Sequence, residues 1–274
     1  MSAFDRAYDE LFARWGVPVE RLELPGKFGM TAVTACGSPD AAPLVLLAGH
    51  GATSAVWRTV ATALARTHRV YAIDLIGDAG RSTLSGPRPK TTADLVGWLS
   101  EVLDGLGVDR AGFIGHSYGA WLALTYALAA PDRVDRLALI DPTDCFTRPS
   151  VRYVAKALPL LLRPSEARSE AFLRWEIQGV DVDPAWLHLA GLAAVRPAVS
   201  PVRPRRPSAA DLASLQADLL VIVADRSKAH DPRVLATRAT AAGGYVVHIE
   251  AATHHSLPAA HAAELIPALT SHFA

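Results

Sequence analysis

A serine flanked by two glycines is the feature of this sequence that points most directly to chemistry. Ser117 lies between Gly115 and Gly119, directly after the apolar residues Phe113 and Ile114. The pattern predicts a strand, a sharp turn and a helix, because a serine at the tip of such a turn has a strained backbone and its flanking positions must lack bulk. A serine held in this way becomes a nucleophile when a base removes its proton.

The segment Gly115-His116-Ser117-Tyr118-Gly119 resembles the nucleophile elbow of the α/β-hydrolase family, whose motif is G-x-S-x-G. The turn Asp74-Leu75-Ile76-Gly77-Asp78-Ala79-Gly80-Arg81-Ser82 is similar to a second, structural signature of that family. The resemblance implies an α/β fold with a doubly wound, mostly parallel sheet of about eight strands and a helical cap. It also implies a serine hydrolase that forms an acyl-enzyme on Ser117.

A histidine is needed to take the proton of Ser117. The resemblance places this histidine after the last strand, where the chain reads His248-Ile249-Glu250-Ala251-Ala252-Thr253-His254-His255. His254 falls at the position of the family's loop histidine and is the predicted base. His255 remains the alternative, whereas His248 lies inside the strand and is predicted to be structural.

Two aspartates are candidates for the acid that orients this histidine. Most family members carry the acid a few residues past the strand before the last one, where this chain has Ser227, which cannot hold a histidine as a carboxylate does. Asp225 lies two residues earlier. Asp141 ends the strand after the elbow helix, at a spacing from Ser117 that resembles certain haloalkane dehalogenases and related lactonases. We predict that Asp141 is the acid and keep Asp225 as the alternative.

The resemblance further implies two backbone donors for the oxyanion of acyl transfer. One is the amide of Tyr118, next to the nucleophile, and the other is the amide of Ala52, in the loop Gly49-His50-Gly51-Ala52. His50 itself is predicted to hold this loop together by hydrogen bonds. Candidates to line the substrate pocket, each with burial in a core as its alternative, are Trp57, Cys145, Phe146 and Trp175.

The elements that must position these residues follow from an alternation of apolar and amphipathic segments. Continuous apolar runs predict buried parallel strands at 44–48, 70–73, 111–114, 137–140, 219–223 and 245–249. Amphipathic stretches predict helices at 54–66, 92–106, 118–130, 231–241 and 258–273. A helix over 4–15 and an antiparallel hairpin of strands 19–24 and 30–36 precede them. The alternation predicts crossover connections and a doubly wound sheet, with Ser117 at the carboxyl end of a central strand.

A long interval between the strand ending near 141 and the strand starting near 219 breaks this alternation. Helical patterns fall at 152–162, 165–178 and 184–194, and a connector rich in proline and arginine follows from 196 to 207. The interval resembles the cap of α/β-hydrolases, and a segment of this length needs structure of its own. We therefore predict a hydrolase core formed by 1–141 and 208–274, and a helical cap formed by 142–207.

The composition favours a small-molecule partner over a nucleic acid or a membrane. Half of the 274 residues are hydrophobic, and 27 basic residues balance 27 acidic ones, so no net charge attracts polyanions. No apolar run is long enough to span a bilayer, and the acidic N-terminus does not read as a signal peptide. Cys36 and Cys145 have no metal-ligand spacing. We expect a soluble cytoplasmic protein that needs no metal or organic cofactor.

The sequence thus predicts hydrolysis of a small-molecule carboxylic ester, thioester or lactone, with Ser117, His254 and Asp141 in the catalytic roles. A serine at the elbow argues against the dehalogenase and epoxide hydrolase reactions, which use an aspartate at that position. The alternative is a member of the same fold that does not hydrolyse, and instead binds a ligand or shapes a cofactor-free rearrangement. The absence of an acid at Ser227 motivates this alternative.

Overall fold

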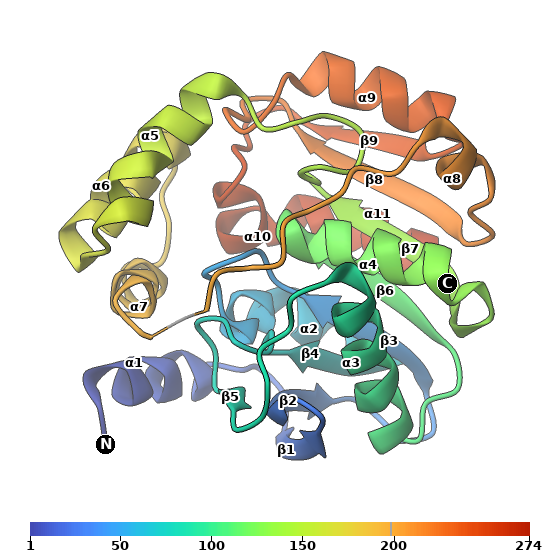
Figure 1. Ribbon diagram of the computed structural model, residues 1–274, viewed down its shortest axis with the longest axis horizontal. Helices are drawn as coiled ribbons and strands as arrows, with labels where there is room; N and C mark the ends of the chain where they lie inside the picture. The colour runs from blue at the N-terminus through green and yellow to red at the C-terminus, as the bar shows by residue number, and fades with distance from the viewer. Residues whose placement is uncertain (198) are drawn as a thin grey trace.

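The computed structural model describes residues 1–197 and 199–274, and in this part of the chain a nine-stranded sheet forms the centre of the molecule (Figure 1). The strand order is β1-β2-β4-β3-β6-β7-β8-β9, and β5 pairs with β2. The strands are β1 (Val19–Gly26), β2 (Gly29–Cys36), β3 (Ala42–Leu47), β4 (His68–Ile73), β5 (Thr83–Leu84), β6 (Ala111–His116), β7 (Val134–Ile140), β8 (Asp218–Ala224) and β9 (Tyr245–Ile249).

The sheet is parallel except at one edge. From β4 through β3, β6, β7 and β8 to β9, each neighbouring pair is parallel. The hairpin of β1 and β2 is antiparallel, and β2 also runs antiparallel to β4 and β5. These pairings confirm the predicted strands and hairpin. The two-residue β5 has no counterpart in the prediction, because so short a strand leaves no periodic pattern in a sequence.

Both faces of the sheet are covered, which explains why its central strands are apolar throughout. On β3, Leu44 and Leu46 pack in one buried cluster, whereas Val45 and Leu47 pack in another. The first cluster includes residues of the helices α2 (Arg58–Leu64) and α11 (Ala262–Phe273). The second includes residues of α3 (Thr92–Gly105), α4 (Tyr118–Ala129) and α9 (Pro232–Ala241). Helices on both faces of a mostly parallel sheet are the predicted doubly wound arrangement.

The remaining elements of the core are short or terminal. Helix α1 covers Ala3–Phe12, and two short 3-10 helices, η1 and η2, cover Ser54–Trp57 and Pro131–Arg133. The predicted helix over 258–273 is interrupted, since α10 (Ser256–Ala260) ends before α11 begins. His261 separates them with a φ of −104° and a ψ of 35°, which is not a helical conformation.

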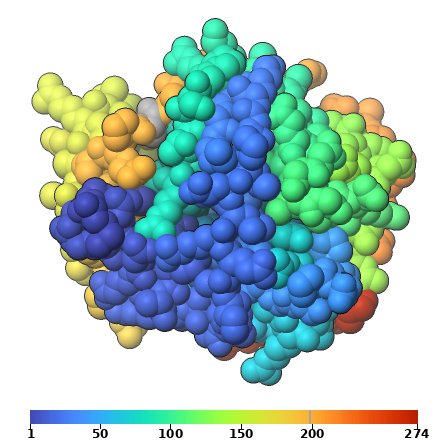
Figure 2. All heavy atoms as spheres, turned by 90° about the horizontal axis from the view of Figure 1, so that it is seen from below, coloured from blue at the N-terminus to red at the C-terminus, as the bar shows by residue number. Residues whose placement is uncertain are grey.

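Three helices form the predicted cap between β7 and β8, and Figure 1 shows them grouped to one side of the sheet. They are α5 (Val151–Leu162), α6 (Glu166–Ile177) and α7 (Pro184–Ala194), and the short α8 (Ala209–Ala213) follows the connector. Helix α7 packs against α6 and against α1. In Figure 2 the dark blue N-terminal segment lies against the yellow and orange atoms of the cap.

One aspartate fastens the cap to the core. The Asp183 carboxylate accepts a hydrogen bond from the Ala185 amide at 2.9 Å and caps the N-terminus of α7. The same carboxylate lies 2.7 Å from a guanidinium nitrogen of Arg58 on α2, and 3.3 Å from one of Arg14, which follows α1. Two core segments therefore hold the start of α7.

Candidate active site

Ser117 occupies the sharp turn that its sequence predicts, between the end of β6 and the start of α4. Its φ is 53° and its ψ is −117°, a backbone conformation that costs roughly 1–3 kcal/mol for a residue with a side chain. The flanking glycines are required by contact. A Cβ on Gly115 would lie 2.4 Å from the Gly119 carbonyl oxygen, and one on Gly119 would lie 2.3 Å from the Leu47 carbonyl oxygen.

Ser117, His254 and Asp141 lie within hydrogen-bond distance of one another in that order. The Ser117 hydroxyl is 2.9 Å from His254 Nε2, and His254 Nδ1 is 2.6 Å from Asp141 Oδ2. A carboxylate only accepts, so Nδ1 carries the hydrogen and Nε2 presents a lone pair to the serine hydroxyl. His254 and Asp141 are almost completely buried. This arrangement can move a proton from the serine to the histidine.

Asp141 has hydrogen-bond partners besides His254. It directly follows β7 with a φ of 40°, and it accepts hydrogen bonds from the Ala224 amide at 3.1 Å, the Ser227 hydroxyl at 2.8 Å and His230 Nε2 at 3.0 Å. Burial acts to raise the pKa of Asp141, but the charge and hydrogen bonds of His230 and His254 outweigh it and hold this pKa well below its ordinary value. The carboxylate is therefore ionised at neutral pH.

Ser227 explains how the chain does without an acid at the usual position. Its hydroxyl donates to Asp141 across the carboxyl end of the sheet, so the residue at that position supports the relocated carboxylate. His230 was not among the predicted site residues, and its side chain is buried against the same carboxylate. In the described residues no group of three or more histidine, cysteine, aspartate or glutamate side chains is arranged to hold a metal ion, and we assign these contacts to hydrogen bonding.

The competing candidates make other contacts. His248 Nδ1 contacts Asp225 Oδ1 at 2.6 Å, and both side chains are partly exposed. His255 Nδ1 lies 3.3 Å from a carboxylate oxygen of Glu176, which belongs to α6. Burial is the largest influence on His254 and lowers its pKa below the ordinary histidine value, although Asp141 acts in the opposite direction. His254 is therefore a neutral imidazole at neutral pH, as a base must be.

The two predicted oxyanion donors differ in the structure. The Tyr118 amide lies in the first turn of α4, where helix N–H groups have no acceptor within the helix. The Ala52 amide donates to the Gly49 carbonyl at 3.1 Å and closes a turn, and its assignment as an oxyanion donor stays a prediction. The described part of the chain gives the His50 amide no such acceptor. Its neighbour Gly49 lies against Ser117, since a Cβ on Gly49 would be 3.2 Å from the Ser117 Cβ.

His50 holds its loop together as predicted. Its Nδ1 lies 2.9 Å from an Asp78 carboxylate oxygen, and the Gly51 amide donates to the same carboxylate at 3.1 Å. The nearby Asp74 is part of the structural turn, because it accepts from the Ser54 and Arg81 amides at 2.7 Å each. These contacts fix the loop that carries the His50 amide.

The four candidates for pocket lining are mostly core residues. Trp57 is fully buried in the cluster that includes α2 and α11, and Cys145 and Phe146 are buried in the opposite cluster. Trp175 lies on the cap, with Lys228 Nζ 4.4 Å from its ring centroid. The role of these residues in substrate binding stays a prediction.

Two aromatic residues of the cap that were not predicted as site residues lie near His254. The Tyr153 ring of α5 is 5.8 Å from the His254 ring, and the Phe172 ring of α6 is 5.4 Å from the Tyr153 ring. The only signal in the sequence was their place on the apolar faces of helices. Such a position does not distinguish a pocket wall from a helix contact.

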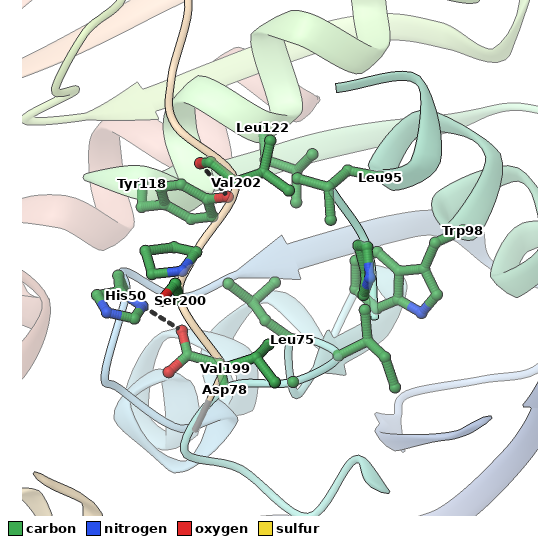
Figure 3. A pocket seen from close by; sticks show the side chains of 14 residues that line it. His50, Leu75, Asp78, Leu95, Trp98, Tyr118, Leu122, Val199, Ser200 and Val202 are labelled. Atoms are coloured by element: carbon green, nitrogen blue, oxygen red, sulfur yellow. Dashed lines mark hydrogen bonds and ion pairs between the residues drawn. The ribbon is translucent and has the colours of Figure 1, made fainter. Parts of the chain in front are cut away.

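A mainly apolar pocket lies beside Tyr118 and His50 (Figure 3). The Tyr118 hydroxyl donates to the Val202 carbonyl at 3.0 Å, so the connector after the cap covers this side of the elbow. Figure 3 also shows His50 directed toward Asp78 on one side of the pocket. Other parts of its wall are Leu75, Leu95, Trp98 and Leu122. An apolar group of a ligand could contact the protein here, next to the residue that follows Ser117.

No helix in residues 1–197 and 199–274 has both the length and the apolar character needed to cross a bilayer.

Comparison with known proteins identifies similar sequences. Over 175 residues the chain is 34% identical to carboxylesterase YbfK of Bacillus subtilis (strain 168), a match that covers 63% of this chain and only 57% of that relative. A match to the uncharacterized carboxylesterase nap of the same organism has 32% identity and covers 65% of this chain and 58% of the relative.

Solved structures are similar over almost the whole chain. The structure of carboxylesterase CesB (YbfK) from Bacillus subtilis has a TM-score of 0.91 and 25% identity, and the match covers 98% of this chain and 96% of that one. Naproxen esterase (carboxylesterase NP) from the same organism shares the fold, with a TM-score of 0.91 at 24% identity over 100% of this chain and 99% of that one. A family model described as alpha/beta hydrolase family matches residues 44–268. The chain therefore belongs to the α/β-hydrolase family.

Proposed function

We propose that this chain is a serine hydrolase that cleaves a carboxylic ester, thioester or lactone through an acyl-enzyme on Ser117. The observation that carries the proposal is the continuous hydrogen-bonded path from Asp141 through His254 to the Ser117 hydroxyl. The similarity to proteins named as carboxylesterases favours carboxylic esters among the three classes.

The proposed reaction begins when the Ser117 hydroxyl attacks the substrate carbonyl and gives its proton to His254 Nε2. Asp141 holds the Nδ1 hydrogen and stabilises the imidazolium that forms. The tetrahedral oxyanion accepts hydrogen bonds from the amides of Tyr118 and His50, which lie beside the nucleophile. Collapse breaks the bond to the alcohol or thiol, which leaves with the proton from Nε2.

Release of the acyl group repeats these steps with water. His254 Nε2 takes a proton from a water molecule, whose oxygen attacks the acyl carbonyl, and the proton then returns to the Ser117 oxygen as the acid departs. The alternative of a non-hydrolytic protein rested on a missing acid at Ser227. That argument is weakened because Asp141 contacts the histidine and Ser227 donates to Asp141.

A fluorophosphonate probe tests the proposal, because it forms a covalent adduct with an activated serine. We expect one adduct on the peptide that contains Ser117, located by mass spectrometry, and its loss in the Ser117→Ala variant and in heat-unfolded protein. Folded protein that gives no adduct on Ser117 would overturn the hydrolase proposal. Hydrolysis rates of matched aryl esters and acyl thioesters would then rank the substrate classes.

A further inference from the structure

Glu176 is a buried carboxylate of the cap that contacts the loop carrying the base. It lies on α6 and has an exposed fraction of 0%. Its two oxygens accept hydrogen bonds from the backbone amides of His254 and His255, each at 3.0 Å, and from the Thr253 hydroxyl at 3.0 Å. His255 Nδ1 is 3.3 Å from the same carboxylate, a contact that becomes an ion pair when His255 is protonated.

These contacts offset a burial that would otherwise be unfavourable. An ionised carboxylate placed in a protein interior costs several kcal/mol unless it is paired and hydrogen-bonded. Burial acts to raise the pKa of Glu176, but the hydrogen bonds and charge of His255 and the charge of His254 outweigh it and lower the pKa to about 2. Glu176 is therefore charged at neutral pH, and the amides of His254 and His255 together with the Thr253 hydroxyl satisfy it.

The same loop is held from the opposite side by the elbow. His116 Nε2 donates to the His254 carbonyl at 2.9 Å, and His116 directly precedes the nucleophile. The His254 backbone is thus fixed at its amide by the cap and at its carbonyl by the core. Since the ring position follows the backbone, both ring contacts, 2.6 Å to Asp141 and 2.9 Å to Ser117, depend on this double attachment.

We propose that Glu176 is a positioning residue through which the cap holds the His254 base in its reactive geometry. The inference rests on the proposed function, because it assigns Glu176 an effect on a base that acts on Ser117. Asp141 and Ser117 belong to the core, whereas Glu176 comes from the inserted helices. Displacement of α6 therefore leaves the amides of His254 and His255 without their acceptor and disorders the base without touching the nucleophile.

The test variant removes the charge of Glu176 and keeps the shape of its side chain. Glu176→Gln presents an amide nitrogen to backbone N–H groups, and the matched control is Glu170→Gln on the same helix, whose side chain is exposed and paired with Arg174. With an aryl ester, we expect kcat of Glu176→Gln to fall by about tenfold to a hundredfold with little change in KM, since small misplacement of a catalytic group costs up to about a hundredfold. The Glu170→Gln control retains the wild-type kcat.

The pH dependence distinguishes positioning by a charge from a general loosening of the cap. The titratable groups that face His254 are Asp141, His230, His116, His255, Glu176 and Tyr153. The charge of Glu176 raises the pKa of His254, so its loss moves the acid limb of kcat/KM to lower pH. A loosened cap alone admits water to His254, which reduces the effect of burial, raises this pKa and moves the limb to higher pH.

A second variant keeps the proposal testable if Glu176→Gln does not fold. Thr253→Val removes one donor to Glu176, and we expect by itself a fall in kcat smaller than the one expected for Glu176→Gln. Where both variants fold, their effects are not additive, because both act through the same contact. Wild-type protein must first give the Ser117 adduct. If it does, and the folded variants retain wild-type kcat and the same acid limb, the positioning role is wrong. A wild type without the adduct indicates instead that the proposed function is wrong.

Discussion

Two of the histidine–aspartate pairs at the last strands of the sheet have the same contact distance. His254 Nδ1 is 2.6 Å from Asp141, and His248 Nδ1 is 2.6 Å from Asp225. In the first pair the side chains are 1% and 0% exposed, and in the second they are 44% and 32% exposed. The distance between the partners therefore does not identify the catalytic pair. Burial and contact with a nucleophile do.

The position of each aspartate in the sheet explains the difference. Asp141 follows β7, which is the neighbour of β6, the strand that ends at the elbow. Asp225 follows β8 and pairs with a residue of β9, the adjacent edge strand. Three donors besides His254 converge on Asp141, whereas water reaches both members of the edge pair. A carboxylate in the first environment holds a single histidine tautomer, and one in the second forms an ordinary surface contact.

The largest expected effect separates the two pairs by activity. Asp141→Asn removes the charge that stabilises the imidazolium and alters the tautomer of His254, so we expect kcat on an activated ester to fall on the order of 10⁴-fold. The matched variant Asp225→Asn keeps the wild-type kcat, because Asp225 contacts neither His254 nor Ser117. Steady-state kinetics of the two purified variants check the ranking, and the reverse ranking would assign the acid to Asp225.

The second expected effect concerns pH. Burial lowers the pKa of His254 below the ordinary value of 6.5, and the neutral form is the base. We expect kcat/KM to stay high as the pH falls to 6.5 and to decline only as it passes through the lowered pKa. Asp225→Asn leaves this limb unchanged. A limb with its midpoint above 6.5 in the wild type would show that the charge of Asp141 outweighs the burial of the imidazole.

The smallest expected effect is on stability. Exposed ion pairs contribute less than about 1 kcal/mol to the free energy of unfolding, so Asp225→Asn should change it by no more than that. Urea unfolding at pH 7, followed by circular dichroism, provides the measurement. A loss of more than about 2 kcal/mol would mean that the edge pair supports the sheet, and the contrast with the buried pair would then be one of function alone.

The local part of the site could be predicted because its physical requirements are local. A strand that leads into a sharp turn and a helix needs glycine at 115 and 119. The sequence has glycine at both positions, and this requirement can be recognised without knowing any long-range contact. The strands and the burial of both sheet faces could also be predicted from the sequence, since continuous apolar runs of strand length indicate strands that are buried on both faces. His254 could be predicted as the base because it follows the last strand, where the family carries its histidine.

Ala52 shows what a motif leaves open. The sequence indicates that the loop after β3 supplies an amide, but which amide is free depends on backbone dihedral angles. The Ala52 amide closes a turn onto Gly49, whereas the described part of the chain gives the His50 amide no backbone acceptor. A sequence motif gives the residue types of a loop but not its dihedral angles, so it does not predict which amide is free.

The sequence by itself determined the family, the nucleophile and a short set of candidates for its partners. The tertiary structure places His254, and not His255, against Ser117, and Asp141, and not Asp225, against His254, because strand order and packing bring one member of each set together. It also added Glu176, which is 78 positions from His254 in the chain. Contacts over such separations arise when elements pack, and no periodicity within a segment records them.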